Sequence, residues 1–188
     1  HWGTGVVYGI HVSGTNVYAS LQDGGLMVST NLGNTFSVRT TAQGLGANYV
    51  SKTFSAGGYV YAAGAVGLGV SNDSGATFTN KTTANGLGSN GTYSAMSNGS
   101  TVYVGTFGGL SVSTDNGTSF ANRTTANGLG HNMVNSVYVV GSTVYAGTGN
   151  YGTSGGVSIS TDSGASFSNK TTSNGLGHNH VFSVFALG

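Results

Sequence analysis

The strongest constraint on the fold is an eight-residue string that occurs four times along the chain. The copies begin at Ser29, Ser71, Ser113 and Ser160, at spacings of 42, 42 and 47 residues, and each ends in Phe. The last three read Ser-x-Asp-x-Gly-x-[Thr/Ser]-Phe, and the first has Asn31 in place of Asp. A repeat of about 40 residues indicates a unit that buries its apolar surface against its neighbours.

Each repeat contains four short apolar runs separated by Gly, Asn and Ser, which is typical of strands joined by tight turns. The chain is therefore expected to be all-β, a β-propeller of four-stranded antiparallel blades. Residues 1–188 are expected to form a single domain. The expected blades cover about residues 1–43, 44–85, 86–127 and 128–174.

The repeated string resembles the Asp-box of sialidase-type (BNR) propellers, and its four copies extend this resemblance over the whole chain. The string that follows it, Thr-Thr-x-x-Gly-Leu-Gly-x-Asn at 124–132, is similar to propeller repeats of bacterial hybrid two-component sensors. Both resemblances imply a propeller. They imply no particular activity, because such folds carry many unrelated functions.

The acidic or amide side chain of the repeated string is expected to stabilise the turn between the third and fourth strands. Asp and Asn accept backbone N–H bonds in tight turns, and the Gly that follows adopts a positive φ without strain. The terminal Phe is expected to pack between blades. The structural residues predicted on this basis are Asn31, Asp73, Asp115 and Asp162.

The loops on the opposite face, between the second and third strands and between blades, should converge near the propeller axis. A ligand site there would use the side chains of these loops, since loops carry function more often than strands. The candidate ligand-binding residues are Trp2, Asp23, Phe107, His131, Tyr151 and His178. Tyr151 belongs to an inserted loop at 149–154.

The histidines suggest a metal site only weakly. His178 and His180 would share one face of a strand and could bind a metal. The position of His131 and His178 is Ser89 in another repeat, however, and a serine there favours plain loop polarity. We therefore expect no metal and no cofactor.

One cation occurs at the same place in the fourth strand of every repeat. This strand is the outer edge of its blade, where a charge discourages edge-to-edge association. The four residues are Arg39, Lys81, Arg123 and Lys170.

The first strand of the repeat occurs a fifth time, at 178–188, without the other three strands. Three explanations are open: a fragment of a larger propeller, an oligomer whose chains share one ring, or strand addition to a neighbouring copy. We favour the last two. The expected partner is therefore a second copy of the chain, in a homo-oligomer or polymer.

The low charge limits the classes of partner. Charged residues make up 5% of the chain and the net charge is +1, so we expect no nucleic-acid partner. No apolar run approaches the roughly 20 residues of a membrane helix, so no membrane insertion is expected. A surface of Ser, Thr, Asn and Gly favours an extracellular or cell-surface location.

The chain lacks the groups of a glycosidase. The sialidase resemblance implies an arginine triad and a Tyr–Glu pair, whereas this sequence has two arginines and no Glu. Asp23 is the only carboxylate outside the repeated turns, and glycoside hydrolysis needs two. The leading hypothesis is a non-enzymatic extracellular structural or interaction propeller that self-assembles. The alternatives are a lectin-like, glycan-binding propeller and a fragment of a sialidase-like glycoside hydrolase.

Overall fold

The computed structural model describes residues 6–152 and 154–187, and in them sixteen strands form four separate antiparallel sheets. Blade 1 contains β1 (Val7–Ser13), β2 (Asn16–Leu21), β3 (Leu26–Ser29) and β4 (Ser37–Arg39). Blade 2 contains β5 (Val50–Ala56), β6 (Tyr59–Gly64), β7 (Gly67–Ser71) and β8 (Thr79–Lys81). Blade 3 contains β9 (Thr92–Asn98), β10 (Thr101–Thr106), β11 (Gly109–Ser113) and β12 (Ala121–Arg123). Blade 4 contains β13 (Val134–Val140), β14 (Thr143–Gly149), β15 (Gly155–Ser160) and β16 (Ser168–Lys170).

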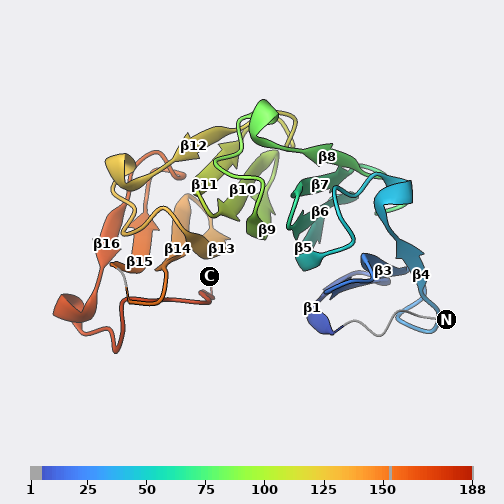
Figure 1. The fold of residues 1–188 in the computed structure, drawn as a ribbon, viewed down its shortest axis with the longest axis horizontal. Coiled ribbons are helices and arrows are strands. Elements are labelled where there is room, and N and C mark those ends of the chain that lie inside the picture. The colour runs from blue at the N-terminus through green and yellow to red at the C-terminus, as the bar shows by residue number, and fades with distance from the viewer. Residues whose placement is uncertain (1–5, 153, 188) are drawn as a thin grey trace.

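The four blades stand side by side in an open arc (Figure 1). Each sheet keeps its strands in chain order, with the first strand on the inner side of the arc and the fourth on the outer side. Successive inner strands β1, β5, β9 and β13 contact one another. The predicted all-β fold of four-stranded propeller blades is confirmed.

The hydrophobic core lies between the blades and is divided into three clusters. Tyr18 of blade 1 belongs to a cluster with Leu45 and Val60 of blade 2. The same arrangement recurs between blades 2 and 3 and between blades 3 and 4. Each blade therefore buries apolar side chains on its neighbour, as expected for a repeat that cannot form a core alone.

A one-turn 3-10 helix follows the outer strand of every blade. The four are η1 (Thr41–Gln43), η2 (Thr83–Asn85), η3 (Thr125–Asn127) and η4 (Thr172–Asn174). In η2, the hydroxyl of Thr82 accepts the Ala84 N–H, and Gly86 ends the turn at φ 92°. An added Cβ on Gly86 would lie 2.0 Å from the Phe120 carbonyl oxygen. The glycine of the Gly-Leu-Gly string is therefore required by the blade that follows.

The Ser-x-Asp-x-Gly turns have the hydrogen bonds that the sequence predicts. The Asp73 carboxylate accepts the Ser71 hydroxyl at 2.6 Å, the Thr77 N–H at 2.9 Å and the Thr77 hydroxyl at 2.6 Å. Asn31 reproduces this pattern with an amide, accepting the Thr35 N–H at 3.0 Å and donating to its hydroxyl at 2.9 Å. Each of these turns is thus closed by side-chain bonds of its own residues.

Two of the four outer-strand cations, the arginines, make contacts beyond their own blade. Arg39 Nε donates to the Gly75 carbonyl of the next blade at 2.9 Å, and Arg123 Nε donates to the Gly164 carbonyl at 3.1 Å. These arginines tie an outer strand to the neighbouring turn. The expected effect of the outer-strand charges, to discourage edge-to-edge association, stays a prediction.

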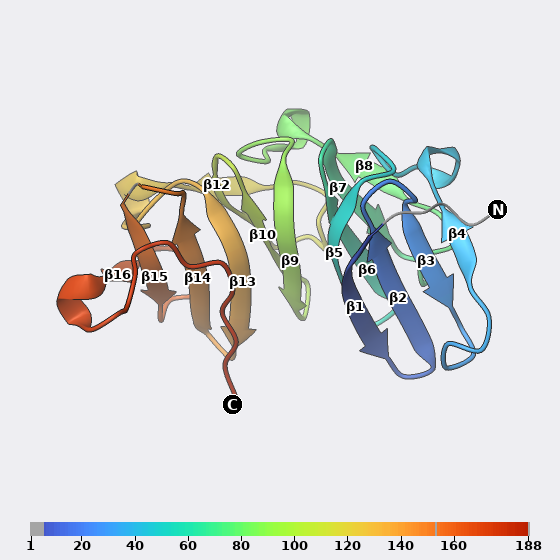
Figure 2. The ribbon, with the colours of Figure 1, turned by 60° about the horizontal axis from the view of Figure 1, so that its bottom comes forward.

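The C-terminal segment, residues 180–187, occupies the place of an inner strand beyond blade 4. The Asn135 amide donates to the Val181 carbonyl at 3.0 Å, as the Ser51 hydroxyl donates to the equivalent Thr92 carbonyl at 3.2 Å. Figure 2 shows the segment crossing β14 and continuing beside β13. Its position matches the fifth first strand expected from the repeat count.

This segment forms no β-ladder with any described strand, although the sequence predicts a strand at 178–188. Its contacts with blade 4 include the Val181 N–H bond to the Thr148 carbonyl at 3.2 Å and side-chain packing, such as Phe185 against Tyr138 at 4.8 Å between ring centroids. Successive inner strands meet through side chains and not through ladders. The ladder partner of an inner strand is the second strand of its own blade.

Candidate functional site

The inner strands share a local irregularity that sets the direction of their side chains. Each has a β-bulge against the second strand of its blade, so that one residue has no partner in the ladder. The four bulged residues are Tyr8, Ser51, Tyr93 and Asn135. A bulge turns a side chain away from the regular alternation. The four inner strands therefore present equivalent residues in the same way.

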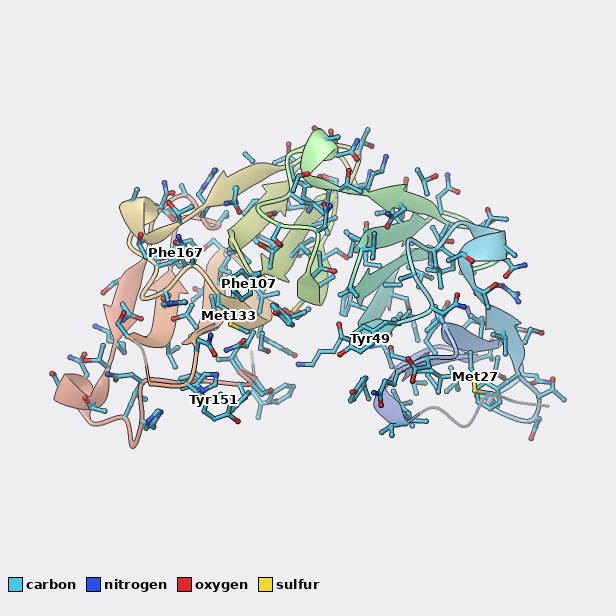
Figure 3. The ribbon with its side chains drawn as sticks, in the orientation of Figure 1. Met27, Tyr49, Phe107, Met133, Tyr151 and Phe167 are labelled. Carbon is cyan, nitrogen blue, oxygen red and sulfur yellow. The ribbon has the colours of Figure 1, made fainter. Side chains whose placement is uncertain are left out.

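All four bulged residues line one hollow on the inner side of the arc, which we call the aromatic hollow. It has a volume of about 300 Å³. Its lining residues are Tyr8, Tyr49, Ser51, Lys52, Tyr93, Met133, Asn135 and Phe182. Phe182 holds in the C-terminal segment the place that the bulged residues hold in the blades. Figure 3 shows Tyr49 and Met133 on the inner side of the arc.

Several rings of the aromatic hollow remain accessible to solvent. Tyr8 is 46% exposed and Phe182 is 58% exposed. The rings of Tyr8 and Tyr49 lie 5.6 Å apart between centroids. Partial burial, followed by the contact with Tyr8, raises the pKa of Tyr49, and burial raises the pKa of Tyr93. Both side chains are therefore neutral hydroxyl groups at physiological pH.

A second hollow adjoins the first and has a volume of about 230 Å³. The four residues that follow the bulges line it, together with Ser183 of the C-terminal segment. Three of these five residues are serines: Ser94, Ser136 and Ser183. We call it the serine hollow. Lys52 lines both hollows. Burial lowers the pKa of Lys52, and no acidic neighbour counteracts this effect.

The bulged residues also hold neighbouring inner strands together in two places. Ser51 donates to the Ala63 and Thr92 carbonyls, at 3.0 and 3.2 Å. Asn135 joins the Gly149 carbonyl, at 2.9 Å, to the C-terminal segment. In the described residues, Tyr8 and Tyr93 make no bond of this kind between neighbouring segments.

The structure places three of the sequence-predicted ligand residues beside the aromatic hollow. Asp23 is close enough to Tyr49 to contribute to the raised pKa of that phenol. Tyr151 is 77% exposed and packs edge-on against His180 and Phe182, at 4.7 and 5.7 Å between centroids. His131 accepts the N–H of Met133, which lines the hollow.

Two other predicted residues, Phe107 and His178, do not line the hollow. Phe107 is 55% exposed and does not line it. His178 Nδ1 accepts the His180 N–H at 2.9 Å, a loop bond that Ser89 makes to Gly91 in another blade. Trp2 lies outside the described residues. In residues 6–152 and 154–187, no three His, Cys, Asp or Glu side chains gather as metal ligands.

The sequence analysis missed most residues of the hollow. Tyr8, Tyr49, Tyr93, Lys52 and Phe182 lie in or next to the inner strands and the C-terminal segment, and none of them is among the predicted ligand residues. The available indication was that the bulge position varies between Tyr, Ser and Asn, whereas the turns and linkers repeat. The bulge itself has no pattern in the sequence, because one extra residue leaves the apolar run intact.

Comparisons with known proteins support the fold alone. No protein-family model matches the chain, and no curated protein matches it. Among solved structures, the extracellular domain of a hybrid two-component system from B. thetaiotaomicron matches with a TM-score of 0.71 and 16% identity over 94% of this chain. An ancestral GH74 enzyme matches with a TM-score of 0.63 and 17% identity over 91% of the chain.

The chain is much shorter than these two structures. It spans 24% of the sensor domain and 25% of the GH74 enzyme. It spans 92% of the computationally designed protein Ika4, which covers 84% of this chain with a TM-score of 0.63 and 13% identity. All three likenesses agree with the blade architecture. At these identities they carry no statement about activity.

Proposed function

We propose that this chain is a non-enzymatic, extracellular interaction propeller that binds a saccharide in the aromatic hollow. The observation that carries the proposal is the set of four β-bulges, which bring Tyr8, Ser51, Tyr93 and Asn135 to one place. Bulges of this kind are enriched beside functional sites, where they direct side chains. Scaffold packing alone does not call for three residue types, Tyr, Ser and Asn, at four equivalent positions.

The composition of the hollow favours a saccharide ligand. Exposed tyrosine and phenylalanine rings offer flat apolar faces, and phenol hydroxyls offer polar edges. A sugar ring has the same combination of C–H faces and hydroxyl edges. Concave sites that mix aromatic rings with a few polar groups are the usual form of small-ligand sites.

The state of the carboxylates supports a non-enzymatic role. Asp73, Asp115 and Asp162 are held in their turns by hydroxyl and backbone donors, and these bonds lower the pKa of each carboxyl. A glycosidase acid needs a raised pKa, and this chemistry needs a pair of carboxyls. Asp23 beside Tyr49 is then the single carboxylate left for the site.

The extracellular assignment rests on likeness and composition. The sensor structure that this chain resembles is an extracellular domain. The chain is poor in charge and rich in Ser, Thr, Asn and Gly. None of the helices in the described residues is long or apolar enough to cross a membrane. We further propose that the Ser-x-Asp-x-Gly turns are Asp-boxes of the sialidase type.

Glycan-array screening followed by calorimetry tests the function. We expect binding that is lost in Tyr49→Ala, weakened in Tyr151→Ala and unchanged in Phe107→Ala. Phe107 is the matched control, because it is an exposed aromatic residue that does not line the hollow. Absence of binding to every glycan, or loss of binding in Phe107→Ala alone, would refute the proposal.

Self-assembly through the C-terminal segment is a second candidate function. Phe182, Phe185 and Leu187 are 58%, 71% and 86% exposed, and the segment has no ladder partner in the described residues. A second copy could supply that partner by strand addition. Light scattering would then give a multiple of the chain mass that decreases to the monomer in Phe185→Ser. A monomer for the parent chain would contradict it.

A further inference from the structure

We propose that the ligand of the aromatic hollow is an acidic saccharide whose carboxylate is bound by Lys52; this inference rests on the proposed function. Lys52 is the residue that lines both the aromatic and the serine hollow. Its ammonium group is therefore available to a ligand that lies in either hollow.

Among the described residues, Lys52 is the only Lys or Arg that lies outside the outer strands. The other four basic residues of the chain lie in the outer strands β4, β8, β12 and β16. Lys52 is an exposed residue of β5; partial desolvation of its ammonium group lowers its pKa, and no acidic side chain of the described residues acts on it. A bound carboxylate would supply the missing counter-charge. Charge-assisted bonds of this type are among the strongest in proteins.

The serine hollow offers further donors at the same level. Ser94 and Ser136 occupy the position of Lys52 in the next two blades. Ser94 is only 4% exposed, and its hydroxyl has no hydrogen-bond partner in the structure. The Ser136 hydroxyl accepts the Val184 N–H at 3.3 Å, which leaves its proton free to be donated. Buried polar groups without partners are uncommon and call for an explanation.

The number of cations selects the kind of anion. Polyanions such as nucleic acids need many cationic contacts for affinity, and the inner face has one. A sugar ring that bears one carboxylate matches one ammonium group, while the tyrosine rings contact its C–H face. The aromatic and charged parts of the site thus fit the two parts of a uronic acid residue.

The bulges argue against an acidic peptide as the occupant. Extended peptides bind by pairing with a free strand edge, and the inner strands are the edges that face this surface. Each of them is interrupted by its bulge at the hollow. A bulge breaks the regular spacing of donors and acceptors that a peptide would pair with.

Calorimetry with tetragalacturonate and with its fully methyl-esterified form tests the inference, because esterification removes the charge of each carboxyl and adds only a methyl group. We expect the acid to bind at least about tenfold more tightly than the ester. Lys52→Gln should remove this preference, and Lys52→Met should do the same while it keeps the apolar stem. Lys81→Gln is the matched control, since it removes the same charge from an outer strand. Melting curves establish that the variants are folded.

The outcomes separate the inference from the proposed function. Equal binding of acid and ester, unaffected by Lys52→Gln but lost in Tyr49→Ala, would overturn the acidic ligand and leave saccharide binding intact. No binding of these sugars or of any glycan would overturn both. Binding of hexaglutamate in place of the sugar, with dependence on Lys52, would show a peptide site and overturn the saccharide assignment.

Discussion

The turns and linkers repeat their bonds from blade to blade, whereas the bulged inner strands differ in every blade. The hydroxyls of Thr82 and Thr124 accept equivalent N–H groups, and Gly86 and Gly128 end the 3-10 turns at φ 92° and 93°. At the bulge, by contrast, the residues are Tyr8, Ser51, Tyr93 and Asn135. The residues of the turns and linkers are restricted by their contacts with the next blade. The bulge position lines the aromatic hollow, and its residue type varies between blades.

This difference separates scaffold from site. A linker residue that is replaced loses a bond or gains a clash with the following blade, so its identity is restricted. A bulged residue that is replaced changes mainly the lining of the hollow. Substitutions in the linkers and at the bulges should therefore differ in their effects on stability and on binding.

Gly86→Ala should destabilise the protein far more than Gly175→Ala. Both glycines end a 3-10 turn at φ 92° and 93°, but a Cβ on Gly86 would collide with the Phe120 carbonyl, while Gly175 has nothing within 4 Å. We expect losses of about 4 kcal/mol and about 1 kcal/mol in the free energy of unfolding. Urea unfolding measures both. Equal losses would mean that the next blade does not restrict the linker.

Tyr93→Ser should weaken saccharide binding about tenfold while it lowers stability by less than about 1 kcal/mol. Serine is the bulged residue of blade 2, so blade 3 can accept it without a change in packing. Calorimetry and thermal unfolding measure the two effects. A large loss of stability with unchanged binding would reverse the roles assigned to scaffold and site.

Asp73→Asn should remove part of the acid sensitivity of stability. Bonds from Ser71 and Thr77 lower the pKa of Asp73 from 3.8 to about 2, so its contribution is present above pH 3.8 and is lost as the pH falls toward 2. Since this carboxylate is exposed, solvent screening leaves about 0.5 kcal/mol. Asn31 shows that an amide fits the turn.

Urea unfolding of the parent and of Asp73→Asn at pH 7 and at pH 2.5 measures this effect. The difference between the two proteins should be present at pH 7 and shrink at pH 2.5. A difference that grows as the pH falls would contradict the sign. Asn31→Asp provides the converse test, because it adds a titrating group to the first turn.

His131→Ser should have the smallest effect, within about 0.5 kcal/mol of the parent. Serine makes the same loop bond at Ser89, where its hydroxyl accepts the Gly91 N–H at 3.2 Å. Thermal unfolding measures stability, and calorimetry measures saccharide binding. A loss of binding without a loss of stability would instead assign His131 to the ligand site.

Local patterns predicted the blade well and the site poorly. The turn residues Asp73, Asp115 and Asp162 could be assigned because their bonds lie within eight residues of sequence. Of the candidate ligand residues, Asp23, Tyr151 and His131 adjoin the hollow, but its lining comes from strands. The 3-10 turns were also missed, since a single turn has no period to detect.

The sequence by itself determined the number and kind of blades, because each repeat contains its own turn chemistry and apolar alternation. It also determined that a fifth inner segment follows the fourth blade. Only the tertiary structure decided which residues meet on the inner face. Their convergence depends on bulges in four strands, and on side chains of five segments separated by about one repeat each. No local pattern encodes such distances, so Lys52 and Tyr93 acquire a shared role only when the blades are assembled.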